Sequence, residues 1–382
     1  MSVDVRTVEP ASPLEAPTQW VRDRAWIAAW WTGGRALVLL TALIVHALNI
    51  RGYSSSESRG HALGLLTGWD GIWYRRVAAD GYLLIPGRQS DPAFFPLYPV
   101  LLRGVHATGL GYPTAGLLLS NLALLVALVA FEAITRELFG STFAKRATVY
   151  VAIFPLGYVF SMAYPESLVL GAIALAGLAA MRGRWAAAAI FAAAAALARP
   201  EGLFVALPVL VCAWRQRHAL TPVARGIALG AVLSPAAALA SYPLYLGSVL
   251  HDPLAWNEAE RAWGRAFSPL GVGHAIIHLP HALATNPWLV RDVIAFAVYA
   301  VLLVAARRAG APGPWLLGAV AVVALPLFSG SFDSIGRFGL LALPVFWGLA
   351  WIGRTPHADR TIRGASLFLL VALTATIPLV FP

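Results

Sequence analysis

Apolar residues fill long runs of this chain, and short polar breaks separate the runs. A run of about 20 largely apolar residues is long enough to cross a membrane as a helix, whereas an open strand would leave backbone groups unpaired there. The pattern therefore predicts an all-α, polytopic transmembrane helical bundle. About eleven spans are predicted, at residues 35–50, 114–136, 147–163, 167–181, 185–198, 203–214, 226–247, 289–306, 314–329, 338–352 and 364–381.

Composition agrees with this class. Hydrophobic residues make up 59% of the 382 residues and charged residues 12%, and the mean hydropathy is +0.71, which excludes a soluble domain. The runs 185–198 and 203–214 are short for a bilayer-spanning helix. Residues 186–198 are mostly alanine, and small side chains let helices approach closely. Either the bilayer thins at these short helices or they are embedded among others.

The charge distribution predicts the orientation. The net charge of +10 would suit a nucleic-acid-binding protein, but arginines recur in the breaks between apolar runs, as is typical of cytoplasmic loops. We therefore expect no nucleic-acid partner, a cytoplasmic N-terminus and an external C-terminus. The arginine pairs of these breaks are Arg182 and Arg184, Arg215 and Arg217, Arg307 and Arg308, and Arg360 and Arg363.

This topology puts two large loops, residues 51–113 and 247–291, on the extracytoplasmic side. Residues 1–30 are predicted to be a cytoplasmic N-terminal segment, and residues 31–382 a single transmembrane domain. No small-residue cleavage site follows the first apolar run, so it is expected to act as an uncleaved signal anchor. The single cysteine, Cys212, excludes an intrachain disulfide and a CxxC site.

Aromatic residues recur at helical spacing in both loops. Trp69, Trp73 and Val77 are each four residues apart, which predicts an amphipathic helix lying on the membrane surface. A second interfacial helix is predicted in the later loop, with one side formed by Trp256, Trp263 and Phe267.

Several motifs carry a resemblance to a known family. Residues 69–82 read Trp-Asp-Gly-Ile-Trp-Tyr-Arg-Arg-Val-Ala-Ala-Asp-Gly-Tyr, and residues 93–99 read Ala-Phe-Phe-Pro-Leu-Tyr-Pro. Together they resemble the first extracytoplasmic loop of PIG-V-type mannosyltransferases, the family of the second GPI mannosyltransferase and its bacterial relatives. Three later segments agree with this, at residues 163–168, 198–202 and 331–346. The chain departs from the eukaryotic members at 199–202, where Arg-Pro-Glu-Gly stands in place of an Arg-Ser-Asn-Gly-like turn.

The resemblance, which covers about residues 30–355, implies a C-type glycosyltransferase. Such an enzyme takes its sugar, here mannose, from a polyprenyl phosphate and works on the extracytoplasmic face of the cell membrane. The acceptor stays open between a glycolipid, a glycan and a protein. A donor that leaves as a single phosphate needs no metal in principle, so no cofactor is expected. A divalent metal held by Asp70, Asp91 and Glu166 remains the alternative.

Asp70 is the predicted catalytic base. It lies where a lipid phosphate would present its sugar, at the membrane surface. In an inverting transfer a base removes the proton of the acceptor hydroxyl while that oxygen attacks the anomeric carbon. Asp70 also starts the predicted helix, where its side chain can cap free backbone N–H groups. Both roles stay open.

Arg199 and Arg337 are predicted to bind the leaving phosphate through charge-assisted hydrogen bonds. Each is an isolated arginine at the outer end of a predicted span, where burial of a charge is costly. Arg199 can instead extend to the lipid headgroups. Arg337 can instead pair with Asp333, four residues earlier.

Five further residues are predicted to contact substrate. The acidic ones also suit caps, turns or solvated positions, and the aromatic ones, expected to stack on the sugar, also suit an interfacial belt. These residues are Asp91, Glu166, Glu201, Trp73 and Tyr74. The i, i+4, i+7 spacing of His274, His278 and His281 favours a helix face over a metal site.

Other function classes receive less support. There is no Walker loop, no GxGxxG after a strand and no GxSxG elbow, so nucleotide, dinucleotide and serine-hydrolase chemistry are not indicated. A transporter or lipid flippase would place ionisable residues in mid-span, whereas here they gather at span ends. A noncatalytic membrane partner would explain the aromatic loops without a role for Asp70.

Overall fold

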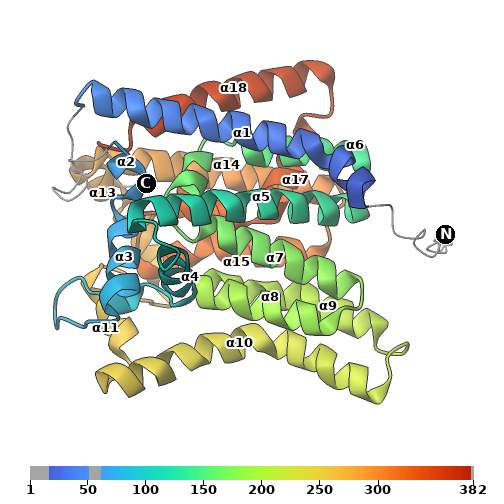
Figure 1. Ribbon diagram of the computed structural model, residues 1–382, viewed down its shortest axis with the longest axis horizontal. Helices are drawn as coiled ribbons and strands as arrows, with labels where there is room; N and C mark the ends of the chain where they lie inside the picture. Colours follow the sequence, from blue (N-terminus) through green and yellow to red (C-terminus); the bar gives the residue numbers. More distant parts are fainter. Residues whose placement is uncertain (1–16, 51–61, 380–382) are drawn as a thin grey trace.

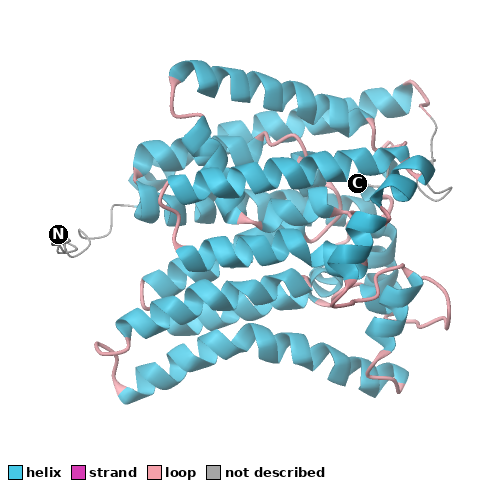
Figure 2. Ribbon diagram, turned by 180° about the vertical axis from the view of Figure 1, so that it is seen from behind, coloured by secondary structure: helices cyan, strands magenta, loops and turns pink. Residues whose placement is uncertain are grey.

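The computed structural model describes residues 17–50 and 62–379, with side chains from residue 23 onward. Parts of three predictions lie outside these residues: the start of the N-terminal segment, positions 51–61 of the first loop and the end of the last span. In the described part of the chain every regular element is a helix (Figure 2). This confirms the all-α class, while the division into a segment and one domain stays a prediction.

The longer helices run side by side and form a bundle (Figure 1). Large apolar side chains are exposed along them, for example Val223 and Leu244, each 74% exposed, as expected of a surface that faces lipid. The five longest helices are α1 (Pro17–Ala47), α5 (Tyr112–Phe139), α10 (Pro222–Leu250), α14 (Val290–Arg308) and α18 (Pro356–Ala375).

Shorter helices pack between and beside the long ones. The alanine-rich α8 packs between α7 and α10, and Ala188, Ala192 and Ala195 are fully buried there, so the expected embedding of this short helix is confirmed. Gly348 lets α17 approach α14, because a Cβ at that position would lie 1.9 Å from the Leu302 carbonyl oxygen. These shorter helices are α6 (Ser141–Ala152), α7 (Glu166–Met181), α8 (Trp185–Ala198), α9 (Ala206–Gln216), α15 (Gly313–Ala324) and α17 (Leu343–Ile352).

Fewer helices than predicted are long and apolar enough to cross a membrane alone. Four pass this test in the described chain: residues 23–47, 112–139, 222–250 and 287–308. A fifth is possible if the segments 335–341 and 343–352, bent by 86° against each other, act as one broken span. The prediction of about eleven crossings is not confirmed by helix length and composition.

Short elements gather at one end of the bundle, on the left in Figure 1, and we call this the site end. Both predicted extracytoplasmic loops contribute to it. The α7–α8 and α9–α10 connections lie at the opposite end, as does the start of α1. The short α-helices are α2 (Gly64–Thr67), α3 (Asp70–Asp80), α4 (Leu97–His106), α11 (Ala255–Ala262), α12 (Gly271–Ile277), α13 (Leu279–Thr285) and α16 (Ile335–Phe338).

Six 3-10 turns connect or extend the described helices. They allow the chain to change direction between helices without a long loop. These turns are η2 (Asp91–Ala93), η3 (Gly157–Ser161), η4 (Pro200–Val205), η5 (Pro287–Leu289), η6 (Leu325–Ser329) and η7 (Gly339–Leu341).

The first helix starts earlier than the predicted span. Helix α1 begins at Pro17, and its apolar stretch spans residues 23–47, so Arg35 lies within the helix instead of at its start. The Arg35 guanidinium is buried and donates to the carbonyl oxygens of Gly157 and Ala152 and to the Ser161 hydroxyl. These neutral acceptors satisfy a cation that would otherwise be costly in the membrane interior.

Candidate active site

Helix α3 places Asp70 in the protein interior. Its buried residues include Asp70, Tyr74 and Val77. Of the predicted stripe, Val77 is therefore buried, whereas Trp69 and Trp73 are half-buried. The N-cap of α3 is Trp69, which makes no side-chain capping hydrogen bond, and the Asp70 carboxylate accepts a hydrogen bond from Arg337. The Asp70 backbone N–H instead donates to the Tyr164 hydroxyl at 3.1 Å.

Arg337, from α16, holds the Asp70 carboxylate. Its Nη1 donates to Asp70 Oδ2 at 2.5 Å, and its Nε lies 3.4 Å from Glu166 Oε1. Asp333 accepts a hydrogen bond from the Ser331 hydroxyl instead, so the predicted alternative of an Arg337–Asp333 pair is wrong. Residues 267 positions apart in the sequence, Asp70 and Arg337, therefore form one buried ion pair.

Arg199 joins this pair through Glu166. Its Nη1 donates to Glu166 Oε1 at 2.8 Å, and its Nε and Nη2 donate to the two oxygens of Glu201, each at 3.0 Å. The Arg199 side chain is only 9% exposed, so it does not extend to the headgroups. Burial raises the pKa of Glu201, but the charge and hydrogen bonds of Arg199 outweigh this, and the pKa lies below its ordinary value.

These five side chains form what we call the carboxylate–arginine cluster. Three carboxylates face two guanidinium groups, so one negative charge is left over when all are ionised. Both arginines already have carboxylate partners, which reduces their capacity to bind a phosphate. The members are Asp70, Glu166, Arg199, Glu201 and Arg337.

A largely apolar cavity of about 380 Å³ opens beside the cluster. Tyr74 lines it, together with every cluster residue except Glu166. We call it the apolar cavity. The Asp70 Oδ1 atom has no hydrogen-bond partner among the described residues, so it can accept a hydrogen bond from a molecule in the cavity. The apolar lining includes Ala93, Phe94, Phe95, Leu239, Pro243 and Leu325.

Two further residues of this cavity were not predicted from the sequence. Glu260, on α11, is half-buried; burial raises its pKa to about 7, with Arg265 opposing the shift. The Arg265 guanidinium has no hydrogen bond or ion pair within the described residues. In the sequence both residues lie outside the side of the predicted second interfacial helix that Trp256, Trp263 and Phe267 form. That helix ends at Ala262, and the chain then turns Arg265 inward.

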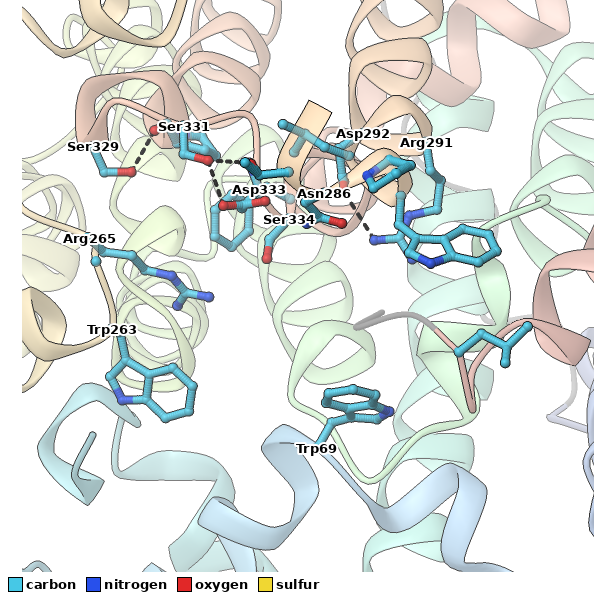
Figure 3. Close-up of a pocket in the computed structure, with 18 residues that line it drawn as sticks. Trp69, Trp263, Arg265, Asn286, Arg291, Asp292, Ser329, Ser331, Asp333 and Ser334 are labelled. Carbon is cyan, nitrogen blue, oxygen red and sulfur yellow. Dashed lines mark hydrogen bonds and ion pairs between the residues drawn. The ribbon is translucent and has the colours of Figure 1, made fainter. Parts of the chain in front are cut away.

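A second, more polar cavity of about 590 Å³ adjoins the first (Figure 3). We call it the polar cavity. Its lining combines three tryptophans with hydroxyl, amide, carboxylate and guanidinium groups. The residues that line both cavities are Arg265, Pro326, Ser329 and Phe338.

Two of the predicted substrate contacts lie apart from the cavities. Trp73 packs in an aromatic group with Phe94 and Trp263 and lines neither cavity. Asp91 is buried in η2 and also lines neither. The structure therefore brings Asp70, Tyr74, Glu166, Glu201 and the two arginines together, and leaves Trp73 and Asp91 outside.

No metal centre stands out. In residues 17–50 and 62–379, no three His, Cys, Asp or Glu side chains come close enough to hold a metal ion. The predicted alternative of a metal at Asp70, Asp91 and Glu166 therefore has no geometric basis here. His274 and His278 lie side by side, with ring centroids 4.1 Å apart.

No family model and no curated protein matches this sequence. Structural matches include the archaeal oligosaccharyltransferase of Archaeoglobus fulgidus in complex with an inhibitory peptide and a dolichol-phosphate. The two chains are 13% identical with a TM-score of 0.46, and the match covers 93% of this chain and 56% of that one. Another structure of that enzyme, with Zn and sulfate, gives 13% identity, a TM-score of 0.42 and coverage of 90% and 53%. The chain thus spans little more than half their length, and a likeness this distant carries no argument about activity.

Proposed function

We propose that this protein is a membrane glycosyltransferase of the C type that transfers a sugar from a polyprenyl phosphate to an acceptor hydroxyl with inversion. The resemblance of residues 69–82 and 93–99 to PIG-V-type enzymes makes mannose the expected sugar and the extracytoplasmic face of the cell membrane the expected location. One observation carries the proposal: the buried Asp70 carboxylate, held by Arg337, faces a largely apolar cavity.

In the proposed reaction Asp70 acts as the base. Its Oδ1 accepts the proton of the acceptor hydroxyl as the acceptor oxygen bonds to the anomeric carbon. The bond from that carbon to the phosphate oxygen breaks on the opposite face, and the polyprenyl phosphate leaves with the electron pair. Arg337 fixes the carboxylate so that the unpartnered oxygen stays turned to the cavity, because its hydrogen bond occupies Oδ2.

Arg265 is the residue we assign to the donor phosphate. A phosphate needs a cation that is not already neutralised, and the guanidinium groups of Arg199 and Arg337 are taken by carboxylates. Arg265 lines the same cavity and has no such partner in the described part of the chain. The aromatic and aliphatic lining suits the first isoprenoid units of the donor.

The position of the charges favours an enzyme over a transporter. Asp70 and Glu166 are the first residues of their helices, and Arg199 directly follows α8. A transport path would place such groups near the middle of spanning helices. Arg35 and Glu132 are buried further inside long helices. Arg35 donates to neutral groups, and Glu132 pairs with Arg24 and Arg136, away from both cavities, so both have structural roles.

The test is transfer of radiolabelled mannose from polyprenyl phosphate mannose to a panel of acceptors by purified protein in lipid nanodiscs. Asp70→Asn keeps the size of the side chain and removes the base, so transfer should fall by about 100-fold to 10,000-fold while donor binding persists. Asp80→Asn is the matched control, because Asp80 lies at the exposed end of the same helix. Transfer that persists in Asp70→Asn would refute the base; wild-type protein that neither binds nor uses the donor would refute the function.

A further inference from the structure

We propose that the polar cavity is an acceptor site for the pyranose ring of a glycan or glycolipid. This inference rests on the proposed function, since it names the class of acceptor that the enzyme would glycosylate. It starts from the contrast in lining: the cavity next to Asp70 is mostly apolar, whereas this one is lined by Arg291, Asp292, Asn286, Asp333 and other polar groups.

Three polar atoms of the polar-cavity lining are buried without a hydrogen-bond partner among the described residues. They are Trp263 Nε1, Arg291 Nε and Ser334 Oγ. An unsatisfied buried polar group costs about 1–3 kcal/mol, and such groups in a native site call for an explanation. A ligand rich in hydroxyl groups would satisfy donors of this kind.

The backbone is strained at two points of the same cavity. Ser334 has φ +67° and Trp69 has φ +54°, a region that residues with a side chain rarely adopt. Such strain persists where the surroundings hold it in place, and it gathers at ligand-binding positions. At Ser334 the turn directs the start of α16, which carries Arg337 to Asp70.

The arrangement in Figure 3 fits a sugar. Trp69 and Trp263 lie on one side of the cavity, Asp333 and Ser334 on the other, and the Arg265 guanidinium extends between them. An indole offers a flat apolar surface to the C–H face of a pyranose ring. Carboxylate and hydroxyl groups opposite can then bind the ring hydroxyls.

The cavity also lies where an acceptor must be. Trp69 directly precedes Asp70, and Phe338, which lines both cavities, directly follows Arg337. A sugar in the polar cavity can therefore direct one hydroxyl to the Asp70 carboxylate while the donor occupies the apolar cavity. The volume of about 590 Å³ is within the range of small-molecule sites.

The experiment measures sugar binding without turnover. Saturation-transfer NMR records the binding of methyl α-D-mannopyranoside, methyl α-D-glucopyranoside, octyl α-D-mannopyranoside and a serine- and threonine-containing peptide to protein in nanodiscs. We expect a pyranoside to bind, and the octyl glycoside to bind more tightly than the methyl glycoside if the natural acceptor is a glycolipid. Ser334→Ala, which keeps Cβ, and Asp333→Asn should each weaken binding by about threefold to tenfold.

Asp80→Asn is the matched control for Asp333→Asn, because both aspartates are exposed and Asp80 lines neither cavity. No pyranoside binding to the wild-type protein overturns the inference, as does binding that neither variant weakens. Peptide binding that Ser334→Ala abolishes would indicate a protein acceptor instead. Failure of this test leaves the Asp70→Asn result intact, so the two proposals fail separately.

Discussion

Arg35 and Arg337 are both buried arginines in apolar surroundings, yet their partners differ. Arg35 donates to two backbone carbonyls and one hydroxyl, all neutral, and lines neither cavity at the site end. Its neighbour Gly34 lets α1 approach residue 152 so closely that a Cβ would lie 2.6 Å from the Ala152 carbonyl oxygen. Arg35 therefore fastens one helix to another.

Arg337 is bound by carboxylates and opens onto a cavity. Replacing Arg35 leaves neutral acceptors without a donor, which costs about 1–3 kcal/mol. Removing Arg337 leaves the buried Asp70 carboxylate without a counterion, while Glu166 keeps Arg199. The comparison teaches that burial alone does not identify a functional arginine. The charge of its partners and the cavity beside it do.

The largest effect is expected for Arg337→Met. Breaking a buried ion pair by removing one partner costs about 3–5 kcal/mol, so the variant should be markedly less stable in detergent. Transfer should fall by at least about 100-fold, because Asp70 loses its orientation. Stability is followed by thermal unfolding, and transfer is measured per folded molecule.

Arg35→Met is the matched comparison for that prediction. It should also unfold more readily, but transfer per folded molecule should stay within about twofold of wild type, since surviving native protein keeps its site. The double variant Arg337→Met with Asp70→Asn should regain stability without regaining transfer, because the uncompensated charge is gone and the base is missing. Equal loss of specific activity in Arg35→Met and Arg337→Met would contradict the assignment of a structural role to Arg35 and of a role at the site to Arg337.

Arg265 extends the comparison to an arginine without a partner in the described chain. Arg265→Gln should raise the KM for the polyprenyl phosphate donor by about tenfold, the size of one charge-assisted hydrogen bond. Stability should hardly change, since no hydrogen bond or ion pair of the described chain is lost; only the longer-range attraction to Glu260 is removed. Arg261→Gln, an exposed position of the same segment, serves as the control. An unchanged donor KM in Arg265→Gln would contradict this role and favour Arg199 and Arg337 as the residues that bind the donor phosphate.

Much of the fold was predictable from the sequence, because hydrophobic runs report helices directly. Asp70 and Arg337 were singled out as candidates, through their motifs and their isolation at span ends. Their pairing was not, since the sequence suggested the nearby Asp333 as the partner of Arg337, and ion pairs between distant segments depend on tertiary packing. Arg265 was missed because the helix ends at Ala262 and Gly264, at φ +75°, changes which way the following residues face. Glu260 lies within that helix, and it was missed because only packing shows that its side of the helix meets the apolar cavity.

Glu260 tests the electrostatics of the apolar cavity through pH. Burial raises its pKa to about 7, and Arg265, Glu201, Arg199 and Asp70 are the charged groups that act on it. As the pH rises through 7 the carboxylate becomes charged, repels a phosphate and attracts Arg265. Donor affinity should therefore fall by about fivefold between pH 6 and 8, as measured by equilibrium binding.

Glu260→Gln should remove that dependence and keep the affinity found at low pH. The donor itself is a phosphodiester that keeps one negative charge over this range, so it does not titrate. Glu258→Gln, on the same helix but outside both cavities, should leave the wild-type profile in place. A slope that survives in Glu260→Gln would have to come from another group.

The smallest effect concerns Asp91, a buried carboxylate that lines neither cavity. Its Oδ1 atom has no hydrogen-bond partner in the described chain, and burial raises its pKa, with the Leu83 amide partly opposing the shift. A raised carboxyl pKa means that the folded state holds the proton more tightly, so the wild type loses stability as the pH rises above the unfolded value of about 3.9.

Asp91→Asn removes this loss. It should be more stable than wild type at pH 7 by roughly 1 kcal/mol, the lower end of the cost of an unsatisfied polar group, with no difference below about pH 4. Unfolding curves in detergent at several pH values check this. A loss of transfer in the same variant would show that Asp91 contacts substrate, as its place beside the first-loop motif predicted.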